Sequence, residues 1–197
     1  MPLRVLLRCV GVHADVGCEF EEGKKEILAM NATSEIKIST GGADQQTFVV
    51  LGVLIQFLST PQQIDDDICV MRGTIPPGVV IPLHSHADPE IFYVLNGSLE
   101  VFQSEGWQTV TAGEVVSIPG NVRHAIRNTS SSAISLVNVS KQEHYGFFRE
   151  LARPFDPNNP AAPPTPEEMQ RLFIAAKKYE YWLASPEENA AVGISLG

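Results

Sequence analysis

The stretch PLHSHADPEIFYVLNG, residues 82–97, contains the features that are most informative about the fold. It contains two of the five histidines, His84 and His86, and Glu90 follows four residues after the second. Because side chains alternate between the two faces of a strand, these three residues share one face if the segment is extended. Its last two residues, Asn96-Gly97, are the strongest short signal for a type I′ hairpin turn. The stretch therefore predicts β-structure with polar side chains gathered on one face.

The segment around this stretch, from about 47 to 140, is rich in strand-forming residues. Runs of β-branched and aromatic residues alternate with turn signals at 104–106 and 111–114. Short strands that follow one another with no helix between them are typical of an antiparallel sandwich or barrel. We therefore expect an all-β fold.

The C-terminal part differs in pattern. A short helix is expected after about residue 144, followed by the proline-rich linker DPNNPAAPPTP, which regular helix or sheet cannot accommodate. Thr165 and Ser185 each begin the pattern Ser/Thr-Pro-Glu-Glu, a capping box that starts a helix. Apolar residues from Met169 to Leu183 follow at helical spacing, and we expect them to pack against the barrel or a second subunit.

The chain thus divides into three parts. The N-terminal part has no clear periodicity and is expected to be a peripheral extension. The predicted boundaries are 1–30 for the extension, 31–143 for the β-barrel and 144–197 for the helical tail.

Composition limits the classes of partner. The chain of 197 residues has a formal net charge of −9 and no Lys/Arg run, which makes nucleic acid and anionic membranes poor partners. No apolar run approaches the roughly 20 residues of a spanning helix, and Arg8 interrupts the apolar start too early for a signal peptide. The three cysteines fit no zinc spacing. We expect a cytoplasmic protein with a small molecule as its partner.

His84, His86 and Glu90 on one face would form half of a metal site. Imidazole and carboxylate ligands suit Fe, Mn, Ni, Cu, Co or Zn. A fourth ligand should come from another strand, and His124 is the best candidate because it begins a strand directly after the turn IPGNV.

Alternatives to a metal site must also be considered for these histidines. Histidines on strands are often ordinary core or surface residues, and a pair two residues apart with a carboxylate nearby is only suggestive by itself. Asp88 is an alternative ligand, whereas His13 and His144 are not expected to be ligands.

The surroundings of the histidines resemble the two motifs of the cupin family. The positions that match these motifs in residue type and spacing are Gly78, His84, His86, Glu90 and Gly97, then Gly113, Pro119, His124 and Asn128. The family usually has a second glycine two residues after the proline, where this chain has Asn121. Asparagine tolerates left-handed backbone better than most residues, so the turn is expected to persist.

This resemblance, which covers about residues 70–140, carries implications for fold and cofactor. It implies a double-stranded β-helix, the jelly-roll barrel of cupins, with the short C-terminal helical tail added here. It also implies a divalent transition metal inside the barrel, held by His84, His86, Glu90 and His124.

The tail adds a weaker resemblance to single-domain cupins of the quercetin 2,3-dioxygenase-like group. It implies a dioxygenase acting on a flavonol-like or enol-containing small molecule, whose oxygen binds the metal while Glu90 takes its proton. Strand alternation turns Phe92 and Val94 inward with Glu90, and Phe102 is expected near the mouth, so these three are the predicted substrate contacts. Plain core packing is the alternative for Phe92 and Val94. The alternatives are a non-oxidative metal cupin, such as an isomerase, lyase or decarboxylase, and a non-catalytic cupin that binds a small molecule.

A homodimer is also expected. The run TFVVLGVLIQFL, residues 47–58, is long and apolar enough to be an intersubunit strand. An uncovered edge strand of this kind would promote aggregation, so a second subunit should cover it.

Overall fold

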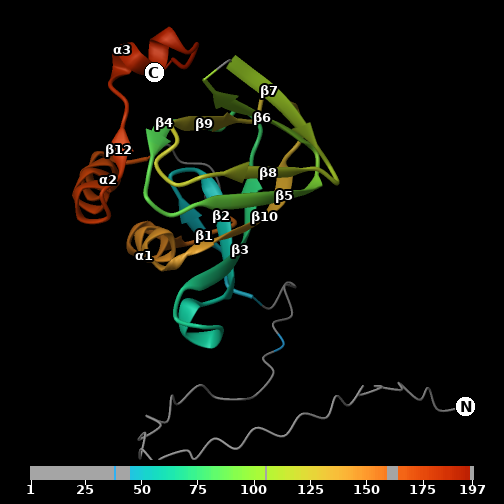
Figure 1. Cartoon of the computed structure of the whole chain (residues 1–197), viewed down its shortest axis with the longest axis vertical. Coiled ribbons are helices and arrows are strands. Elements are labelled where there is room, and N and C mark those ends of the chain that lie inside the picture. Colours follow the sequence, from blue (N-terminus) through green and yellow to red (C-terminus); the bar gives the residue numbers. More distant parts are fainter. Residues whose placement is uncertain (1–37, 39–44, 105, 159–163, 196–197) are drawn as a thin grey trace, which may run out of the picture. The chain divides into compact units, whose positions relative to one another are not determined.

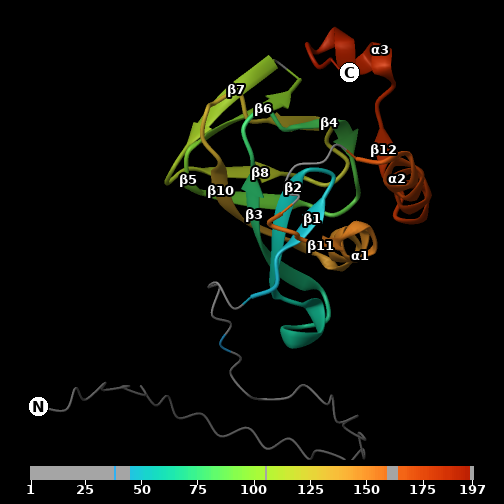
Figure 2. The same ribbon diagram turned by 180° about the vertical axis from the view of Figure 1, so that it is seen from behind.

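The structure, a computed structural model, describes residues 38, 45–104, 106–158 and 164–195. Two antiparallel sheets dominate this part of the chain (Figures 1 and 2). Within it, the larger sheet has seven strands in the spatial order β11 (Arg153–Pro154), β1 (Phe48–Val50), β2 (Val53–Ser59), β3 (Ile68–Ile75), β10 (Ile134–Lys141), β5 (Glu90–Asn96) and β8 (Val115–Ile118). The smaller sheet has five strands over the same described residues, in the order β12 (Trp182–Leu183), β4 (Val80–Ser85), β9 (His124–Arg127), β6 (Ser98–Gln103) and β7 (Gly106–Thr111). The predicted all-β double-sheet fold is confirmed.

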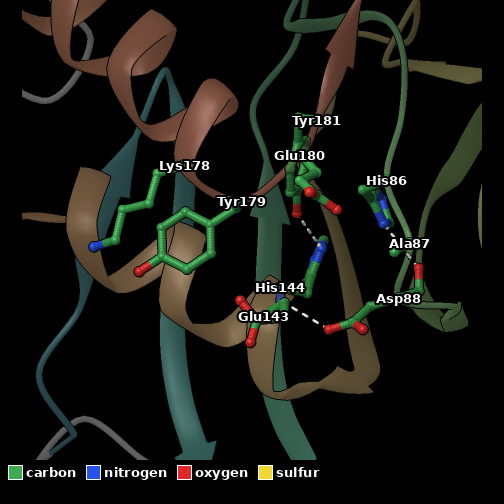
Figure 3. Close-up of a pocket in the computed structure, with 9 residues that line it drawn as sticks. All are labelled: His86, Ala87, Asp88, Glu143, His144, Lys178, Tyr179, Glu180 and Tyr181. Carbon is green, nitrogen blue, oxygen red and sulfur yellow. Dashed lines mark hydrogen bonds between the residues drawn. The ribbon is translucent and has the colours of Figure 1, made fainter.

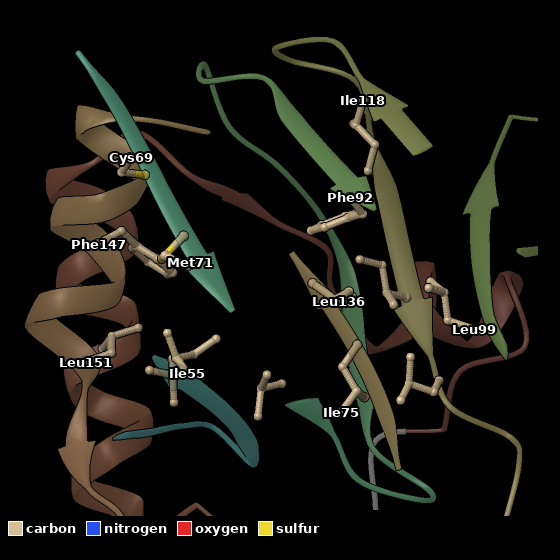
Figure 4. Close-up of a cluster of buried hydrophobic side chains, with 14 of the residues drawn as sticks. Ile55, Cys69, Met71, Ile75, Phe92, Leu99, Ile118, Leu136, Phe147 and Leu151 are labelled. Carbon is tan, nitrogen blue, oxygen red and sulfur yellow. The ribbon is translucent and has the colours of Figure 1, made fainter. Parts of the chain in front are cut away.

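The hydrophobic core draws on both sheets and on helix α1 (Gln142–Leu151), as Figure 4 shows. Phe92 and Leu136 of the larger sheet belong to the same buried cluster as Leu99 of the smaller sheet. Buried and half-buried residues alternate along all of β10, as the period of a strand requires. Fully burying a large apolar side chain contributes about 1.5–3 kcal/mol, so this cluster is the main source of stability for the barrel that holds the site.

Asn96-Gly97 is a crossing between sheets and not a hairpin. β5 ends at Asn96 in the larger sheet, while β6 begins at Ser98 in the smaller one, and the two strands are not neighbours. Gly97 has a φ of 86°, and a Cβ there would lie 3.2 Å from the side chain of Ile134. The glycine is needed because the chain turns where a strand passes close by. The prediction of a type I′ hairpin is therefore wrong.

The apolar run 47–58 is not an edge strand. Leu51 (φ 48°) and Gly52 (φ 92°) turn the chain, so that β1 and β2 pair with each other as a hairpin. β2 then lies between β1 and β3, and the outer strands of the larger sheet are β11 and β8. The prediction that this run offers an edge to a second subunit is therefore wrong, because both of its strands are already paired on each side.

In the described residues after β10, three α-helices alternate with the short strands β11 and β12: α1, α2 (Pro166–Lys178) and α3 (Pro186–Ala191). The two predicted capping boxes are confirmed, with Thr165 accepting from the Glu168 N–H and Ser185 from the Glu188 N–H. None of the helices in the described ranges is long and apolar enough to cross a membrane. The short 3₁₀ helix η1 (Pro61–Gln63) connects β2 to β3.

The end of α2 brings the tail back to the barrel. α2 ends at Lys178, and Glu180 takes a left-handed φ of 55°, so the helical periodicity expected as far as Leu183 is broken. Trp182 and Leu183 instead form β12, which pairs with Ser85 and His84 of β4. Phe173 remains 59% exposed on α2, so the expected apolar stripe is only partly covered within one chain. The extension expected over residues 1–30 lies outside the described residues.

A close approach at Gly120 joins the two loops that flank the histidines. A Cβ on Gly120 would lie 2.0 Å from the carbonyl oxygen of Ala87, and the N–H of Asn121 donates to the carbonyl of His86 at 2.6 Å. Asn121 has a φ of 64°, which confirms that it takes the left-handed position expected of it. Glycine at 120 therefore holds the β4–β5 loop against the β8–β9 loop.

Replacing this glycine should destabilise the barrel. Gly120→Ala is expected to lower the free energy of unfolding by about 1–3 kcal/mol, because the added methyl overlaps a backbone carbonyl that cannot rotate away. The exposed Ser117→Ala on β8 is the control, with an expected change within about 0.5 kcal/mol. Urea unfolding followed by circular dichroism measures both, and equal midpoints for the two variants would show that the loops do not need this contact.

Candidate metal centre

The four predicted ligands converge inside the barrel. His84 of β4 lies directly opposite His124 of β9, His86 lies in the loop after β4, and Glu90 begins β5. Their ligand atoms all lie within 4.8 Å of one another. His86, Glu90 and His124 are 4%, 4% and 2% exposed, whereas His84 is half-buried. Three strands and one loop thus bring together residues that are up to 40 positions apart.

Each of the three imidazoles is anchored in the same way. The Nδ1 atoms of His84, His86 and His124 lie 2.7, 2.8 and 2.9 Å from the backbone carbonyls of Pro82, Asp88 and Val122. A carbonyl oxygen can only accept, so each Nδ1 carries the hydrogen. In the neutral ring, Nε2 then has a free lone pair, which is the arrangement of metal-ligating histidines whose other nitrogen is held by an outer partner.

The position of the Glu90 carboxylate indicates that a cation belongs between it and the histidines. Its Oε2 lies 3.3 Å from Nε2 of His86 and 3.1 Å from Nε2 of His124. If both imidazoles were neutral, two lone pairs would face a negative oxygen with nothing between them. A proton or a metal cation resolves this conflict, and three imidazoles with one carboxylate are a donor set that fits a divalent transition metal.

The protonation preferences of the metal-free site agree. Burial works to raise the pKa of Glu90, but the charge of His144 and hydrogen bonds from His124, His144 and His86 outweigh it and hold this pKa well below its usual range. Burial also works to lower the pKa of His124, yet the hydrogen bond and charge of Glu90 raise it. Burial and the neighbouring His124 lower the pKa of His84 to about 3, so this ring is neutral near pH 7. A carboxylate and a neutral imidazole are both ready to bind a metal.

Sequence reasoning missed two residues that contact Glu90. The Nε2 of His144, on α1, lies 3.0 Å from Oε1 of Glu90, and the amide Nδ2 of Asn138, on β10, donates to the same oxygen at 3.0 Å. His144 is outside the group of four residues whose ligand atoms lie within 4.8 Å of one another. Asn138 could have been found by strand alternation, since it shares the inner face of β10 with Leu136.

Tyr181 is the third missed residue. Its hydroxyl lies 2.7 Å from Nδ1 of His144, and its ring centroid lies 4.7 Å from that of His86. No spacing rule connects Tyr181 with residues almost 100 positions earlier, because the contact depends on the end of α2 and the pairing of β12 with β4.

Asp88, the alternative ligand, has a different place. It lies outside the group of four and accepts the backbone N–H of His144 through Oδ2 at 2.9 Å. Lys141, the N-cap of α1, forms no side-chain cap, so Asp88 caps this helix from another part of the chain. Asp88 therefore positions His144 and does not join the ligand set.

A small pocket of about 120 Å³ opens beside His86, one of the four residues (Figure 3). Its lining comes from the β4–β5 loop, from the start of α1 and from the end of α2 with the residues after it: His86, Ala87, Asp88, Glu143, His144, Lys178, Tyr179, Glu180 and Tyr181. The pocket thus reaches His86 of the ligand set from the side of the C-terminal tail.

Two of the three predicted substrate contacts face the barrel interior. Phe92 and Val94 are 4% and 0% exposed and share the inner face of β5 with Glu90, as alternation predicted. Phe102 pairs with Ala125, so it lies on the face of the smaller sheet opposite to His84 and His124. Phe102 packs edge-on against Trp107 in a second, smaller apolar cluster. None of the three lines the pocket of Figure 3.

Comparisons with known proteins give one family match and several similar solved structures. Residues 71–140 match the family described as Cupin domain. The solved polyketide cyclase RemF from Streptomyces resistomycificus superposes with a TM-score of 0.50 at 17% identity, over 54% of this chain and 80% of its own. A predicted oxalate decarboxylase from Thermotoga maritima gives a TM-score of 0.49 at 19% identity, over 53% and 98%. An RmlC-like cupin from Shewanella frigidimarina gives 0.47 at 17%, over 54% and 92%.

No match to the chain was found among curated proteins. The similarity to solved structures is low in sequence and concerns the fold alone. The family match, the two antiparallel sheets and the motif residues at 84, 86, 90 and 124 nevertheless agree with one another. The barrel of this chain is therefore a cupin domain.

Proposed function

We propose that the chain is a metal-dependent enzyme whose divalent ion is held by His84, His86, Glu90 and His124. The observation that carries this proposal is the arrangement of the imidazoles. All three give their Nδ1 hydrogens to backbone carbonyls, and two of them present Nε2 to Oε2 of Glu90 within 3.3 Å. A metal ion between these atoms would satisfy the Nε2 lone pairs and the carboxylate together, as in metal sites whose histidines are held by an outer partner. The ion is one of Fe, Mn, Ni, Cu, Co or Zn.

In this proposal the substrate is a small molecule with an enol or an enolisable hydroxyl–carbonyl group. The bound ion would supply Lewis acidity and a fixed position for a substrate oxygen. Glu90 is the proposed base, since it is ionised, buried and beside that position, and a carboxylate within hydrogen-bond reach can take the hydroxyl proton. The amide Oδ1 of Asn138 has no hydrogen-bond partner among the described residues, so it can accept from a substrate donor next to Glu90.

A dioxygenase of the quercetinase type remains the first candidate reaction. The apolar residues Phe92 and Val94 are proposed as the barrel-side wall beyond Glu90, whereas the position of Phe102 on the opposite face of the smaller sheet does not support a substrate contact. The pocket of about 120 Å³ is smaller than the roughly 300 Å³ at which drug-sized ligand pockets begin, so a compact enol or β-diketone fits it better than a flavonol does.

A non-oxidative reaction is the second candidate, and one observation favours it. An isomerase, lyase or decarboxylase needs a further acid or base beside the metal. His144 is the candidate for this group, because it lines the pocket and its Nε2 lies 3.0 Å from Oε1 of Glu90, with Tyr181 on its other nitrogen.

Oxygen uptake separates the candidates. The protein is stripped of metal, reconstituted anaerobically with each ion in turn, and assayed with quercetin and with acyclic β-diketones in an oxygen electrode; the metal-free protein is the control. Metal-dependent uptake supports a dioxygenase. Turnover of the same substrates without oxygen, followed by NMR, supports the non-oxidative class. A loaded protein that binds these compounds without converting them would contradict an enzyme and leave a binding cupin.

We also propose that the chain forms a homodimer, now through a sheet face. Ile91, Tyr93, Leu95 and Val115 on the outer side of β5 and β8 are 42–57% exposed, and such a group of apolar side chains favours association. Size-exclusion chromatography with light scattering should give twice 21.5 kDa, and a single species of 21.5 kDa would contradict the proposal.

A further inference from the structure

We propose that the C-terminal tail completes the metal centre, with His144 and Tyr181 as positioning residues that fix the carboxylate of Glu90. The inference rests on the proposed metal site and adds the residues that determine which oxygen of Glu90 faces the three ligand histidines.

The two oxygens of Glu90 have separate surroundings. Oε2 faces the ligand set, 3.1 Å from Nε2 of His124 and 3.3 Å from Nε2 of His86. Oε1 faces the opposite way, 3.0 Å from Nδ2 of Asn138 and 3.0 Å from Nε2 of His144. The Nδ2 of Asn138 donates to Oε1 and also lies 3.3 Å from Nε2 of His144. Rotation of the carboxylate would break this hydrogen bond and the contact with His144, so Oε2 is kept as the oxygen available to a metal.

The hydroxyl of Tyr181 determines how His144 can donate. When it donates to Nδ1 at 2.7 Å, a neutral His144 carries its hydrogen on Nε2, the nitrogen that faces Oε1 of Glu90. A tyrosine hydroxyl ordinarily keeps its proton near pH 7, so it can donate this hydrogen bond. Tyr181 therefore acts on Glu90 through His144.

Both positioning residues are held by the fold and not by the site. The ring of Tyr181 stacks on Phe147 with 3.9 Å between centroids and 11° between planes. The backbone N–H of Tyr181 donates to the carbonyl of Ala176 at 2.8 Å. The backbone N–H of His144 is fixed by Asp88 at 2.9 Å. Figure 3 shows His144 between Asp88 and Tyr181. Held in this way before any ligand arrives, the pair can orient Glu90 in advance.

The test measures cobalt binding to the metal-free full-length protein by chelator competition, together with the visible spectrum of the cobalt form. Tyr181→Phe removes one hydroxyl and keeps the ring. Tyr145→Phe is the matched control, because Tyr145 is also in the tail but its ring packs against Phe57. We expect Tyr181→Phe and His144→Gln each to weaken cobalt binding by about 10- to 100-fold and to change the spectrum, as loss of an outer partner of a metal ligand does.

A double variant tests whether Tyr181 acts through His144. In the His144→Gln background, Tyr181→Phe should weaken cobalt binding by less than about twofold, because the residue it orients is gone. Thermal unfolding of the metal-free variants measures any loss of stability. A purely structural role would lower the melting temperature but leave the spectrum of the bound cobalt unchanged.

Three outcomes would count against the inference. Unchanged affinity and spectrum in both single variants, with cobalt bound tightly by the natural protein, would overturn this inference alone. Fully additive losses in the double variant would overturn the route through His144. A natural protein that binds no cobalt would overturn the proposed metal function and this inference with it.

Discussion

Replacing both His84 and His86 with alanine should abolish stoichiometric metal binding. Two of the four donors are lost, and the remaining pair, His124 and Glu90, cannot enclose an ion. Loss of an outer partner alone typically costs 10- to 100-fold in metal affinity, so the loss of two ligands should exceed about 100-fold. Equilibrium dialysis against cobalt or manganese, with metal measured by elemental analysis, gives the affinity.

The control for this double variant carries two alanines elsewhere in the barrel. Gln108 and Thr109 on β7 are both exposed and lie outside the ligand group, so Gln108→Ala with Thr109→Ala should bind metal like the natural protein. Circular dichroism establishes that both double variants are folded. One tightly bound ion per chain in the His84→Ala/His86→Ala protein would show that the metal site lies elsewhere.

Glu90→Gln should lower kcat by about 10²- to 10⁴-fold on whichever substrate the oxygen-uptake and NMR assays identify, since general-base catalysis contributes on this scale. Glutamine keeps the shape of the side chain but cannot take a proton. If Glu90 is the base, KM should change far less than kcat. If the Glu90→Gln variant had the same kcat as the natural protein, another group would be the base, and His144 is the nearest candidate.

The same variant should change the pH dependence of stability in the metal-free protein. The folded-state pKa of Glu90 is lowered from 4.5, so its contribution is complete above 4.5 and is lost as the pH falls through the folded value. The folded-state pKa of His124 is raised from 6.5 by Glu90, although burial opposes this, so that contribution is complete below 6.5 and is lost as the pH rises through the folded value. The natural protein should exceed Glu90→Gln in stability most between about pH 4.5 and 6.5.

Urea unfolding from pH 3 to pH 8 measures this difference. It should narrow toward both ends of the range, and a difference independent of pH would show that Glu90 and His124 are not coupled. The buffer must contain a chelator, because bound metal would replace the proton on His124 and add its own stabilisation.

Motif spacing predicted which four residues cluster better than it predicted the course of the chain. His84, His86, Glu90 and His124 lie together as expected because strand alternation and the two motifs depend on local geometry. Asn96-Gly97 satisfied the local rule for a hairpin, yet the chain crosses there to the other sheet. A turn within one sheet and a corner between two sheets can both need a left-handed glycine, so Asn-Gly does not distinguish them. At Gly97 the corner passes close to Ile134 of β10.

The parts of the site that come from the tail were beyond local rules. His144 follows the last barrel strand by three residues, and its approach to Glu90 depends on a cap supplied by Asp88 from the opposite loop. Tyr181 reaches it only because α2 ends at Lys178 and the chain returns along β4. Both contacts are long-range consequences of packing, for which neither residue type nor spacing provides a signal.

Elemental analysis of the protein after anaerobic reconstitution and exhaustive dialysis tests the central claim most directly. If His84, His86, Glu90 and His124 hold a metal, the natural protein should retain about one divalent transition-metal ion per chain. A protein that remains metal-free after reconstitution with each of the six candidate ions would contradict the claim, and the cluster would then be an imidazole–carboxylate network held by protons.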